Sequence, residues 1–449
     1  MISPTLAYRA TICLIWGLAL WHSWASRGLF VDGSAFLVQI VRREWFFDFY
    51  DPRLYAMIVA QIPVMTAVIV GVTDFHLMAQ LLSLGLFGLP TGLYHMALCR
   101  AKDEPVLLAT VMAAIAVVFL TTSFFIIGEY NSSYAIAILT AVRLVTARRL
   151  TFGDGIVLVL VSALAIRTYE SMIYLGPVLA TMILWTLRRA PARPVAPTVL
   201  YLLSAAFFLR GMTVAIHSVV YPYSQEHLEE TWQAALDFWQ NFQFDLMFVA
   251  ALIVVVWALV RPIDLLRWRP YRWAGFFVAV LALSPLLAFG DNLVRPLAKS
   301  QYVARSMGGM VITAMVLFIW AYSAPVHRRI KAMVLLRTEG AARRFLTFAC
   351  LMVAANIPSD ILLTTTWMSY LDAARATVTR QSGLIAFEDT PLAHRPHILF
   401  VENWVLSSQS LLLRSKPGDG IIVPPRDFKS WVPFPPLEPP NMGRFVWRE

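Results

Sequence analysis

Charged residues are scarce in this chain. Of its 449 residues, 14% are charged and 59% are hydrophobic, and the mean hydropathy is +0.65. Soluble domains carry roughly a quarter charged residues, so the composition excludes a soluble globular domain and predicts a protein with lipid as its solvent. Cysteine is also rare. Cys13, Cys99 and Cys350 are isolated from one another, which argues against a disulfide framework and a cysteine metal cluster.

Motifs for several common chemistries are missing as well. The sequence contains no glycine-rich phosphate loop, no His/Cys cluster with metal-ligand spacing and no nucleophile elbow. Nothing in it therefore supports ATP-driven transport. The net charge of +10 does not indicate nucleic-acid binding, because the basic residues lie in short loops between apolar segments, where they report membrane topology.

Long apolar stretches dominate what is present. They recur from Leu6 to about Leu363, and a bilayer core ~30 Å thick takes about 20 apolar residues per helix. Lipid-exposed backbone must satisfy its own hydrogen bonds, so the sequence predicts an all-α polytopic membrane protein with about 12 or 13 transmembrane helices. The candidate spans are 6–26, 54–72, 76–98, 105–127, 133–147, 155–167, 171–187, 197–218, 246–260, 273–289, 303–323 and 345–366.

The loops between these spans alternate in charge from Gly128 onward. Clusters of arginine follow the spans that end near 147, 187, 260 and 323, and the positive-inside rule makes these loops cytoplasmic. This predicts a cytoplasmic N-terminus and an extracytoplasmic C-terminus. The first span is rich in Trp and lacks a small-residue cleavage site, so we interpret it as a retained anchor. Many arginines and few lysines favour a bacterial inner membrane.

The segments before Gly128 pose a counting problem. A cytoplasmic start places the loop at 28–53 outside, and the loop at Gly128 is also outward. Two loops on the same side of the membrane must be separated by an even number of spans, yet only three candidate spans lie between these two. Two explanations are open: the helix around Pro90 is broken into two short helices, or the segment at 54–72 is re-entrant.

The outward regions have their own organisation. Segments 32–47 and 225–244 mix aromatic and charged residues at helical spacing, which is typical of helices that lie on the membrane surface. Hydropathy then drops over the last part of the chain, which ends in a proline-rich stretch. We predict a transmembrane domain at 1–366 and a small extracytoplasmic C-terminal region at 367–449.

The first outward loop contains the acids best placed for chemistry. Asp32 follows the first span directly, and Asp51 lies in the sequence DFYDPR that leads into the next. A carboxylate fixed beside the membrane could take a proton from a sugar hydroxyl as general base. The alternative is helix capping, because Asp32 precedes a surface helix and Asp51-Pro52 precedes a span.

Two other outward turns carry polar residues at the membrane boundary. The turn GEYNSS contains Glu129, Tyr130 and Asn131, which either hold a sugar or form an interface turn with a helix cap. The turn RTYE interrupts an apolar run with Arg167 and Glu170. These two residues either bind phosphate and orient a substrate, or form a plain ion pair that locks helices together.

Positive charge on an outward loop is not explained by topology. Arg295, Lys299 and Arg305 occur in DNLVRPLAKSQYVAR, where they bind either a phosphorylated lipid substrate or the anionic headgroups of ordinary lipids. His217, at the outer end of its span, has no second histidine at metal spacing and is interpreted as interfacial. A Mg²⁺ or Mn²⁺ ion is possible, since carboxylates are available, but no ligand cluster demands one.

The order and sidedness of these motifs resemble the C-type (GT-C) superfamily of integral membrane glycosyltransferases, which use polyprenyl-phosphate sugars as donors. Asp32 and the helix after it resemble the catalytic acid and surface helix of the first outward loop, and Arg53 resembles an arginine near the donor phosphate. The stretch at 128–149 is similar to a GQ-x-N, apolar helix, double-Arg pattern, with Glu129 at the Gln position. Arg167 stands where members often carry Lys, and WVLSSQSLLLR at 404–414 is similar to a late Trp- and Ser-containing stretch.

The resemblance implies a reaction. An acceptor hydroxyl, deprotonated by Asp32, would attack the anomeric carbon of the sugar, and polyprenyl phosphate would leave with inversion. The partners would be a polyprenyl-phosphate-linked sugar, membrane lipids and a glycan, lipid or protein acceptor. The donor phosphate would be bound by Arg53, Arg167, Arg295, Lys299 and Arg305, and the sugar or acceptor by Asp51, Glu129, Tyr130, Asn131, Glu170 and Trp404.

Other classes of function remain open at this point. A secondary transporter or lipid flippase would also have many helices and buried charges such as Arg143, although the two related halves typical of transporters are not evident. A polymerase or ligase of surface glycans would share the outward loops. A structural or assembly protein is a further alternative.

Overall fold

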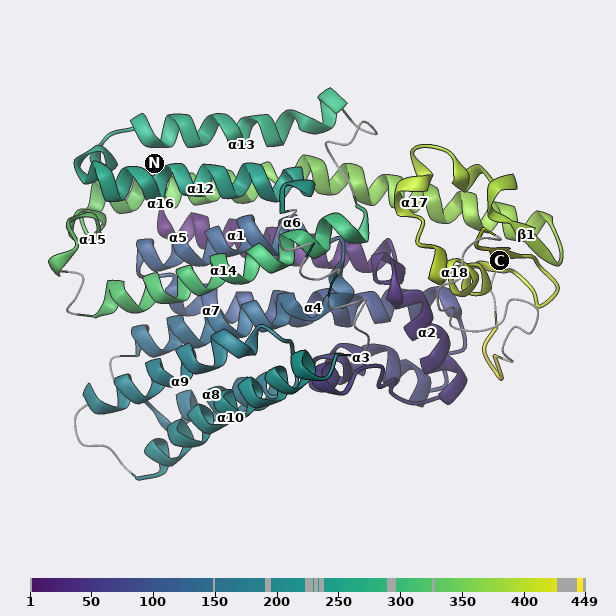
Figure 1. Cartoon of the computed structure of the whole chain (residues 1–449), viewed down its shortest axis with the longest axis horizontal. Helices are drawn as coiled ribbons and strands as arrows, with labels where there is room; N and C mark the ends of the chain where they lie inside the picture. The colour runs from purple at the N-terminus through teal and green to yellow at the C-terminus, as the bar shows by residue number, and fades with distance from the viewer. Residues whose placement is uncertain are drawn as a thin grey trace.

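The computed structural model describes most of the chain as one helical assembly (Figure 1). The prediction of an all-α membrane protein is confirmed at this level: the described residues are mostly helical, and seven helices among them are long and apolar enough to cross a membrane. The residues described are 2–147, 150–189, 195–222, 229, 233, 238–288, 296–324, 328–425 and 442–446.

Helices α1 (Pro4–Trp24) and α4 (Phe75–Ala101) pack side by side and run antiparallel. The Tyr8 hydroxyl lies 3.0 Å from Cys99 Sγ, and Trp16 Nε1 donates to His95 Nδ1 at 3.1 Å. With 21 residues, α1 is roughly 31 Å long at 1.5 Å per residue. That length matches the ~30 Å core of a bilayer.

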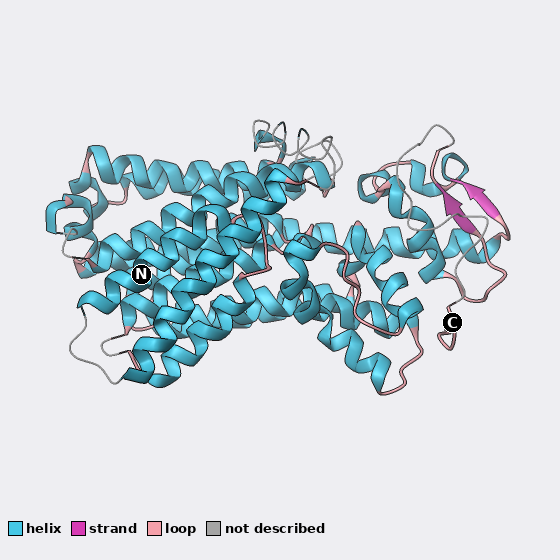
Figure 2. Ribbon diagram, turned by 60° about the horizontal axis from the view of Figure 1, so that its bottom comes forward, coloured by secondary structure: helices cyan, strands magenta, loops and turns pink. Residues whose placement is uncertain are grey.

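Further helices pack around this pair with their long axes roughly parallel (Figures 1 and 2). Their apolar faces form one continuous core. They are α5 (Pro105–Ala114), α6 (Leu120–Thr122), α7 (Tyr130–Thr146), α8 (Phe152–Ala165), α9 (Met172–Arg189), α10 (Val195–Val220), α12 (Phe242–Val260), α13 (Arg269–Ala288), α14 (Ala298–Ser323), α15 (Lys331–Leu336) and α16 (Glu339–Ala355).

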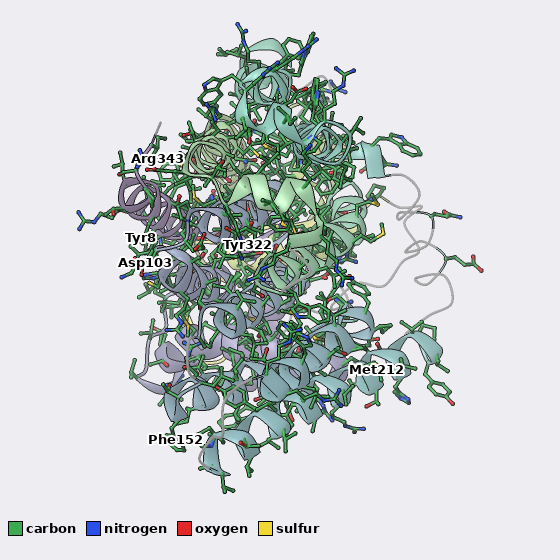
Figure 3. The ribbon with its side chains drawn as sticks, turned by 90° about the vertical axis from the view of Figure 1, so that its left-hand side faces the viewer. Tyr8, Asp103, Phe152, Met212, Tyr322 and Arg343 are labelled. Carbon is green, nitrogen blue, oxygen red and sulfur yellow. The ribbon has the colours of Figure 1, made fainter. Side chains whose placement is uncertain are left out.

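One end of the bundle, which we call the basic end, carries α15 and the arginine-rich loops. Asp154 caps α8 together with Thr151 and also pairs with Arg143 (2.6 Å) and Arg100 (3.1 Å), so one acid joins α4, α7 and α8. Figure 3 shows this end, including Tyr322, whose hydroxyl donates to Glu104 Oε1 at 3.1 Å. Arg143, which the sequence analysis mentioned as a charge that a transporter would also have, is thus paired with Asp154.

The suspected break at Pro90 is wrong, because α4 continues through Pro90 without interruption. Packing of neighbouring helices keeps a proline-containing helix intact in a bundle. Helix α3 (Leu54–Ile69) lies instead along the first half of α4, where an added Cβ at Gly85 would meet the Ala60 carbonyl at 1.7 Å. It begins beside Arg167, and the stretch Asp51–Ile69 is one of the seven that are long and apolar enough to cross a membrane, so the re-entrant alternative stays a prediction.

The opposite end, which we call the appendage end, carries α2 (Asp32–Arg43) and the C-terminal region. Helix α17 (Ile357–Arg380) continues almost directly from α16, and the predicted boundary at 366 falls within it. Beyond α17 come short 3₁₀ turns, α18 (Leu406–Leu413) and two parallel strands, β1 (Leu384–Ala386) and β2 (Ile421–Val423). Figure 2 shows this appendage set beyond the bundle. Because α18 packs on α2, it brings the C-terminal region to the first outward loop.

Candidate functional site

A tight turn between α1 and α2 positions Asp32. Ser26 and Val31 have positive φ angles of 51° and 55°, and for a β-branched residue such as Val31 this conformation is strained. Gly28 donates its amide to Ser83 Oγ at 2.9 Å, and an added Cβ at Gly33 would lie 1.6 Å from the Gly28 carbonyl oxygen. The turn therefore depends on packing against α4 and on glycine at 33, and it fixes the start of α2.

The carboxylate of Asp32 is partly buried and has one side-chain partner among the described residues. Trp404 Nε1 donates to Asp32 Oδ1 at 2.9 Å across 372 positions of sequence. Asp32 is the first residue of α2 rather than its cap, and no side chain caps this helix, so the capping alternative is wrong. Burial raises the pKa of Asp32, while the Trp404 hydrogen bond and the charges of Arg53 and Arg305 oppose that rise in part.

Arg53 joins the two polar turns to the first outward loop. Its Nε and Nη2 both donate to Glu170 Oε1, at 3.0 and 2.7 Å, and its Nη1 lies 3.7 Å from Glu129 Oε2. The guanidinium also lies 4.8 Å from the centre of the Tyr169 ring. One arginine thus faces two carboxylates, and Asp32 lies within its electrostatic reach.

Arg305 enters the same site from α14. Its guanidinium lies 5.7 Å from the ring centres of Phe125 and Tyr130 and 5.9 Å from that of Tyr169. The Tyr134 hydroxyl donates to the Arg305 carbonyl oxygen at 2.6 Å, which fixes the backbone at this point. The side chain is buried, so its charge acts in a low-dielectric setting on Asp32 and Glu129.

Glu129 is the second acid of the site, and it is buried. It has a positive φ of 48° between α6 and α7, and burial raises the pKa of Glu129 to about 8, although the attraction of Arg53 lowers it. Glu129 and Asp32 also raise each other's cost of ionisation, because they are like charges in one buried site.

The pH dependence of stability should therefore report on Glu129. Below about pH 4.5 both folded and unfolded states hold the proton; between there and about pH 8 only the folded state does. Stability contributed by this carboxyl is lost as pH rises through that window, with a slope of at most ~1.4 kcal/mol per pH unit. We expect Glu129→Gln to remove this slope in fluorescence-detected thermal unfolding. The exposed Glu388→Gln should keep it, and equal slopes in native protein and Glu129→Gln would contradict the assignment.

The ion pairs that Arg167 and Glu170 form differ from the pair that the sequence analysis offered. The sequence suggested an ion pair between Arg167 and Glu170, but Glu170 pairs with Arg53 and Arg167 pairs with Asp51 at 2.7 Å. The exchange follows from docking of α3 on this turn, where Tyr55 N donates to the Arg167 carbonyl oxygen at 3.0 Å. Asp51 neither caps the following helix nor lies inside the site; its side chain is exposed at the rim.

Tyr130 and Asn131 are buried beneath the site. The Tyr130 hydroxyl lies 2.8 and 2.9 Å from the carbonyl oxygens of Thr122 and Phe125, so it closes the turn into α7. Asn131 Oδ1 accepts from Thr122 Oγ1 at 3.4 Å, whereas no partner for its Nδ2 is found in the described part of the chain.

Some predicted residues cannot be placed by their contacts. Arg295 and most of segment 225–244 lie outside the described residues, and Lys299 is described only as backbone in the first turn of α14. His217 stacks near Tyr221, with ring centres 4.7 Å apart. Among the described residues no group of three His, Cys, Asp or Glu side chains is close enough to hold a metal ion.

The sequence analysis missed a buried charge cluster next to the site. Asp360 of α17 accepts from Arg27 Nη1 at 2.8 Å and lies 2.7 Å from His22 Nε2, and all three side chains are buried. Arg27 also lies 4.4 Å from the Phe124 ring centre. An acid inside the candidate span 345–366 was the available signal, but the sequence analysis did not single out Asp360.

The chain matches no family model, no curated protein and no solved structure. The class of protein therefore rests on the sequence and structure themselves. They define a mostly helical protein with apolar helices long enough to cross a membrane. Two acids, the partly buried Asp32 and the buried Glu129, and two arginines, Arg53 and Arg305, meet in it toward the appendage end.

Proposed function

We propose that the protein is an integral membrane glycosyltransferase that moves a sugar from a polyprenyl-phosphate donor to an extracytoplasmic acceptor hydroxyl. The observation that carries this proposal is the partly buried Asp32, held by Trp404 within the electrostatic reach of Arg53 and Arg305. A base for a hydroxyl and cations for a phosphate are the two groups that this transfer needs.

In this mechanism Asp32 reacts in its ionised form. Trp404 binds Oδ1, and Oδ2 accepts the proton of the acceptor hydroxyl as that oxygen bonds to the anomeric carbon. The bond from this carbon to the phosphate oxygen breaks with its electron pair, so polyprenyl phosphate leaves and the anomeric centre is inverted. The raised pKa makes Asp32 a stronger base than an exposed aspartate.

The arginines stabilise the leaving group. As the sugar departs, negative charge grows on the phosphate, and Arg53 and Arg305 offer guanidinium groups inside a buried site where such stabilisation is strong. Glu170, which accepts hydrogen bonds from both Nε and Nη2 of Arg53, holds this arginine in place before substrate binds. Arg167 at the exposed rim is placed to meet the donor headgroup at entry.

The proposed topology follows the charge pattern. The basic end faces the cytoplasm, the appendage end faces the extracytoplasmic space, and about 12 or 13 helices cross or enter the membrane. Helix α3 starts at the site and runs toward the appendage, as a re-entrant segment would. A bacterial inner membrane supplies polyprenyl-phosphate sugars to an outward site of this kind.

The direct experiment measures sugar transfer by the purified protein in lipid from a panel of polyprenyl-phosphate sugars. Transfer with inversion from at least one donor supports the proposal. Binding of donors without any transfer, combined with their movement across vesicle membranes, would favour a flippase instead.

Donor affinity should depend on Arg305. We expect Arg305→Gln to weaken binding of polyprenyl phosphate about tenfold or more, because a buried guanidinium that contacts phosphate contributes roughly two kcal/mol. Binding of the uncharged polyprenol should change little. Microscale thermophoresis in detergent measures both, and Arg42→Gln, on the exposed face of α2, is the matched control. Equal loss of polyprenol binding would mean that Arg305 acts through the fold rather than through phosphate.

A further inference from the structure

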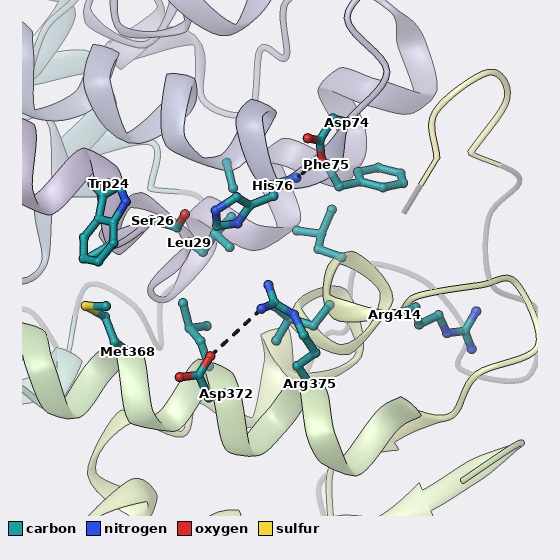
Figure 4. Close-up of a pocket in the computed structure, with 15 residues that line it drawn as sticks. Trp24, Ser26, Leu29, Asp74, Phe75, His76, Met368, Asp372, Arg375 and Arg414 are labelled. Carbon is teal, nitrogen blue, oxygen red and sulfur yellow. Dashed lines mark hydrogen bonds and ion pairs between the residues drawn. The ribbon is translucent and has the colours of Figure 1, made fainter. Parts of the chain in front are cut away.

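A pocket opens toward the appendage end, beside the turn that carries Asp32. Figure 4 shows it between the end of α1, the start of α4, α17 and α18. Its volume is about 140 Å³. Since a cavity of about 10–15 Å³ is enough for one water molecule, the pocket has room for a larger group. Its lining consists of Trp24, Ala25, Ser26, Leu29, Asp74, Phe75, His76, Ala79, Met368, Leu371, Asp372, Arg375, Leu412, Leu413 and Arg414.

The pocket changes from apolar to polar in one direction. Along α17 the lining passes from Met368 and Leu371 to Asp372 and Arg375, and α17 runs toward the appendage. Helix α4 runs the opposite way, and its lining passes from Asp74 back to Ala79. In Figure 4 Trp24 and Met368 lie at one side of the pocket, and Asp372 and Arg375 lie toward its middle.

This gradient coincides with the expected membrane surface. Helix α1 has the length of one bilayer core, and Trp24 at its end is 54% exposed, as is typical of aromatic residues at the lipid–water interface. Gln80 of α4 donates to the Trp24 carbonyl oxygen at 3.2 Å, which places the start of α4 at the same level. A molecule in the pocket would therefore have its apolar part in the bilayer and its polar part outside.

Some of the charged side chains at the polar rim are already held by hydrogen bonds within the protein, and others are not. Asp74 accepts from the His76 amide at 2.9 Å as the cap of α4, and the Arg414 guanidinium donates to the carbonyl oxygens of Gly420 and Pro417. Within the described part of the chain, the charged groups of Asp372 and Arg375 have only each other as partners, at 4.0 Å. The rim thus presents one carboxylate and one guanidinium side by side.

We propose that this pocket binds a zwitterionic phospholipid of the leaflet at the appendage end, such as one with a phosphoethanolamine headgroup. Arg375 binds the phosphate, Asp372 binds the ammonium group, and the upper part of an acyl chain packs between Trp24, Met368 and Leu371. The site is separate from the proposed sugar transfer and does not depend on it. Since Ser26 and Leu29 form one wall, the bound lipid contacts the turn that positions Asp32.

Native mass spectrometry of the purified full chain tests this proposal without any sugar donor. Micelles are supplied with phosphatidylethanolamine, phosphatidylglycerol or diacylglycerol carrying the same acyl chains. We expect one retained phosphatidylethanolamine. Its retained fraction should fall about tenfold in Arg375→Gln and in Asp372→Asn, because each removes one charge-assisted hydrogen bond. Met368→Trp, which fills the apolar part, should also reduce retention.

The control is Arg380→Gln, at the exposed end of α17 and outside the pocket lining, which should retain lipid as the native chain does. Thermal unfolding shows that each variant is folded. Equal retention of diacylglycerol or of phosphatidylglycerol would overturn the proposal, and so would unchanged retention in both charge variants. Failure of sugar transfer has no bearing on this result, so the two proposals can fail separately.

Discussion

Replacement of Asp32 by asparagine is expected to abolish sugar transfer while the protein still folds and binds its donor. Asparagine has the same shape, and its Oδ1 can still accept the hydrogen bond from Trp404, but it cannot take a proton from the acceptor hydroxyl. Loss of a positioned general base lowers rates by ~10²–10⁴-fold. The measurement is the turnover of the preferred polyprenyl-phosphate sugar in lipid, with donor binding measured in parallel.

The matched control is Asp48→Asn in the same loop. Asp48 is exposed and pairs with Arg43 at 3.0 Å, outside the site, so its removal should leave turnover near the native rate. Thermal unfolding of Asp32→Asn should change little, since the side chain is only partly buried and asparagine keeps its shape and the hydrogen bond from Trp404. Native-like turnover by Asp32→Asn would refute the general-base role, and loss of donor binding would indicate a role in binding instead.

The sequence was most informative where functional residues lie close together along the chain. Asp32 follows the first span directly and Arg53 begins the next helix, so their positions at one end of the assembly followed from hydropathy and topology. Glu129 was recognised because an acid at a membrane boundary is costly unless it has a partner. The structure brings all three to one site.

Contacts between distant segments could not be predicted in the same way. Trp404 reaches Asp32 because α18 packs on α2, and Arg27 reaches Asp360 because α17 lies beside the end of α1; these pairs are 372 and 333 positions apart. Hydrophobic periodicity describes which face of a helix is buried but not which neighbour covers it. The resemblance did single out Trp404 as a sugar or acceptor residue, whereas its contact with Asp32 was not anticipated.

The exchanged ion pairs have the same origin. Arg167 and Glu170 lie three positions apart, and such neighbours pair on a helix. Here they lie in the turn between α8 and α9, and the start of α3 docks on that turn. Docking brings Arg53 and Asp51 close enough to be the partners of Glu170 and Arg167 instead.

The expectation that proline breaks a helix also failed at Pro90, because α4 packs against several other helices of the bundle.

The largest effect on stability is expected at Asp360. Asp360→Ala would leave Arg27 with its positive charge buried and without its carboxylate, and His22 would lose the same partner. Removing one member of a buried ion pair costs about 3–5 kcal/mol. We expect a marked fall in the melting temperature, measured by thermal unfolding in detergent, and a shift in the turn that carries Asp32. Asp372→Ala, on the exposed face of the same helix, should change stability by less than ~1 kcal/mol.

A double variant separates the cost of an unpaired charge from the loss of packing. In Arg27→Met with Asp360→Leu, neither buried charge remains, and apolar side chains of similar size fill the space. Such replacements of buried pairs are often neutral or stabilising, so the double variant should recover most of the stability lost in Asp360→Ala. If it is as unstable as the single variant, the cluster stabilises the fold through shape or through His22. If it is stable but transfers sugar slowly, the ion pair between α1 and α17 serves to position the turn before Asp32.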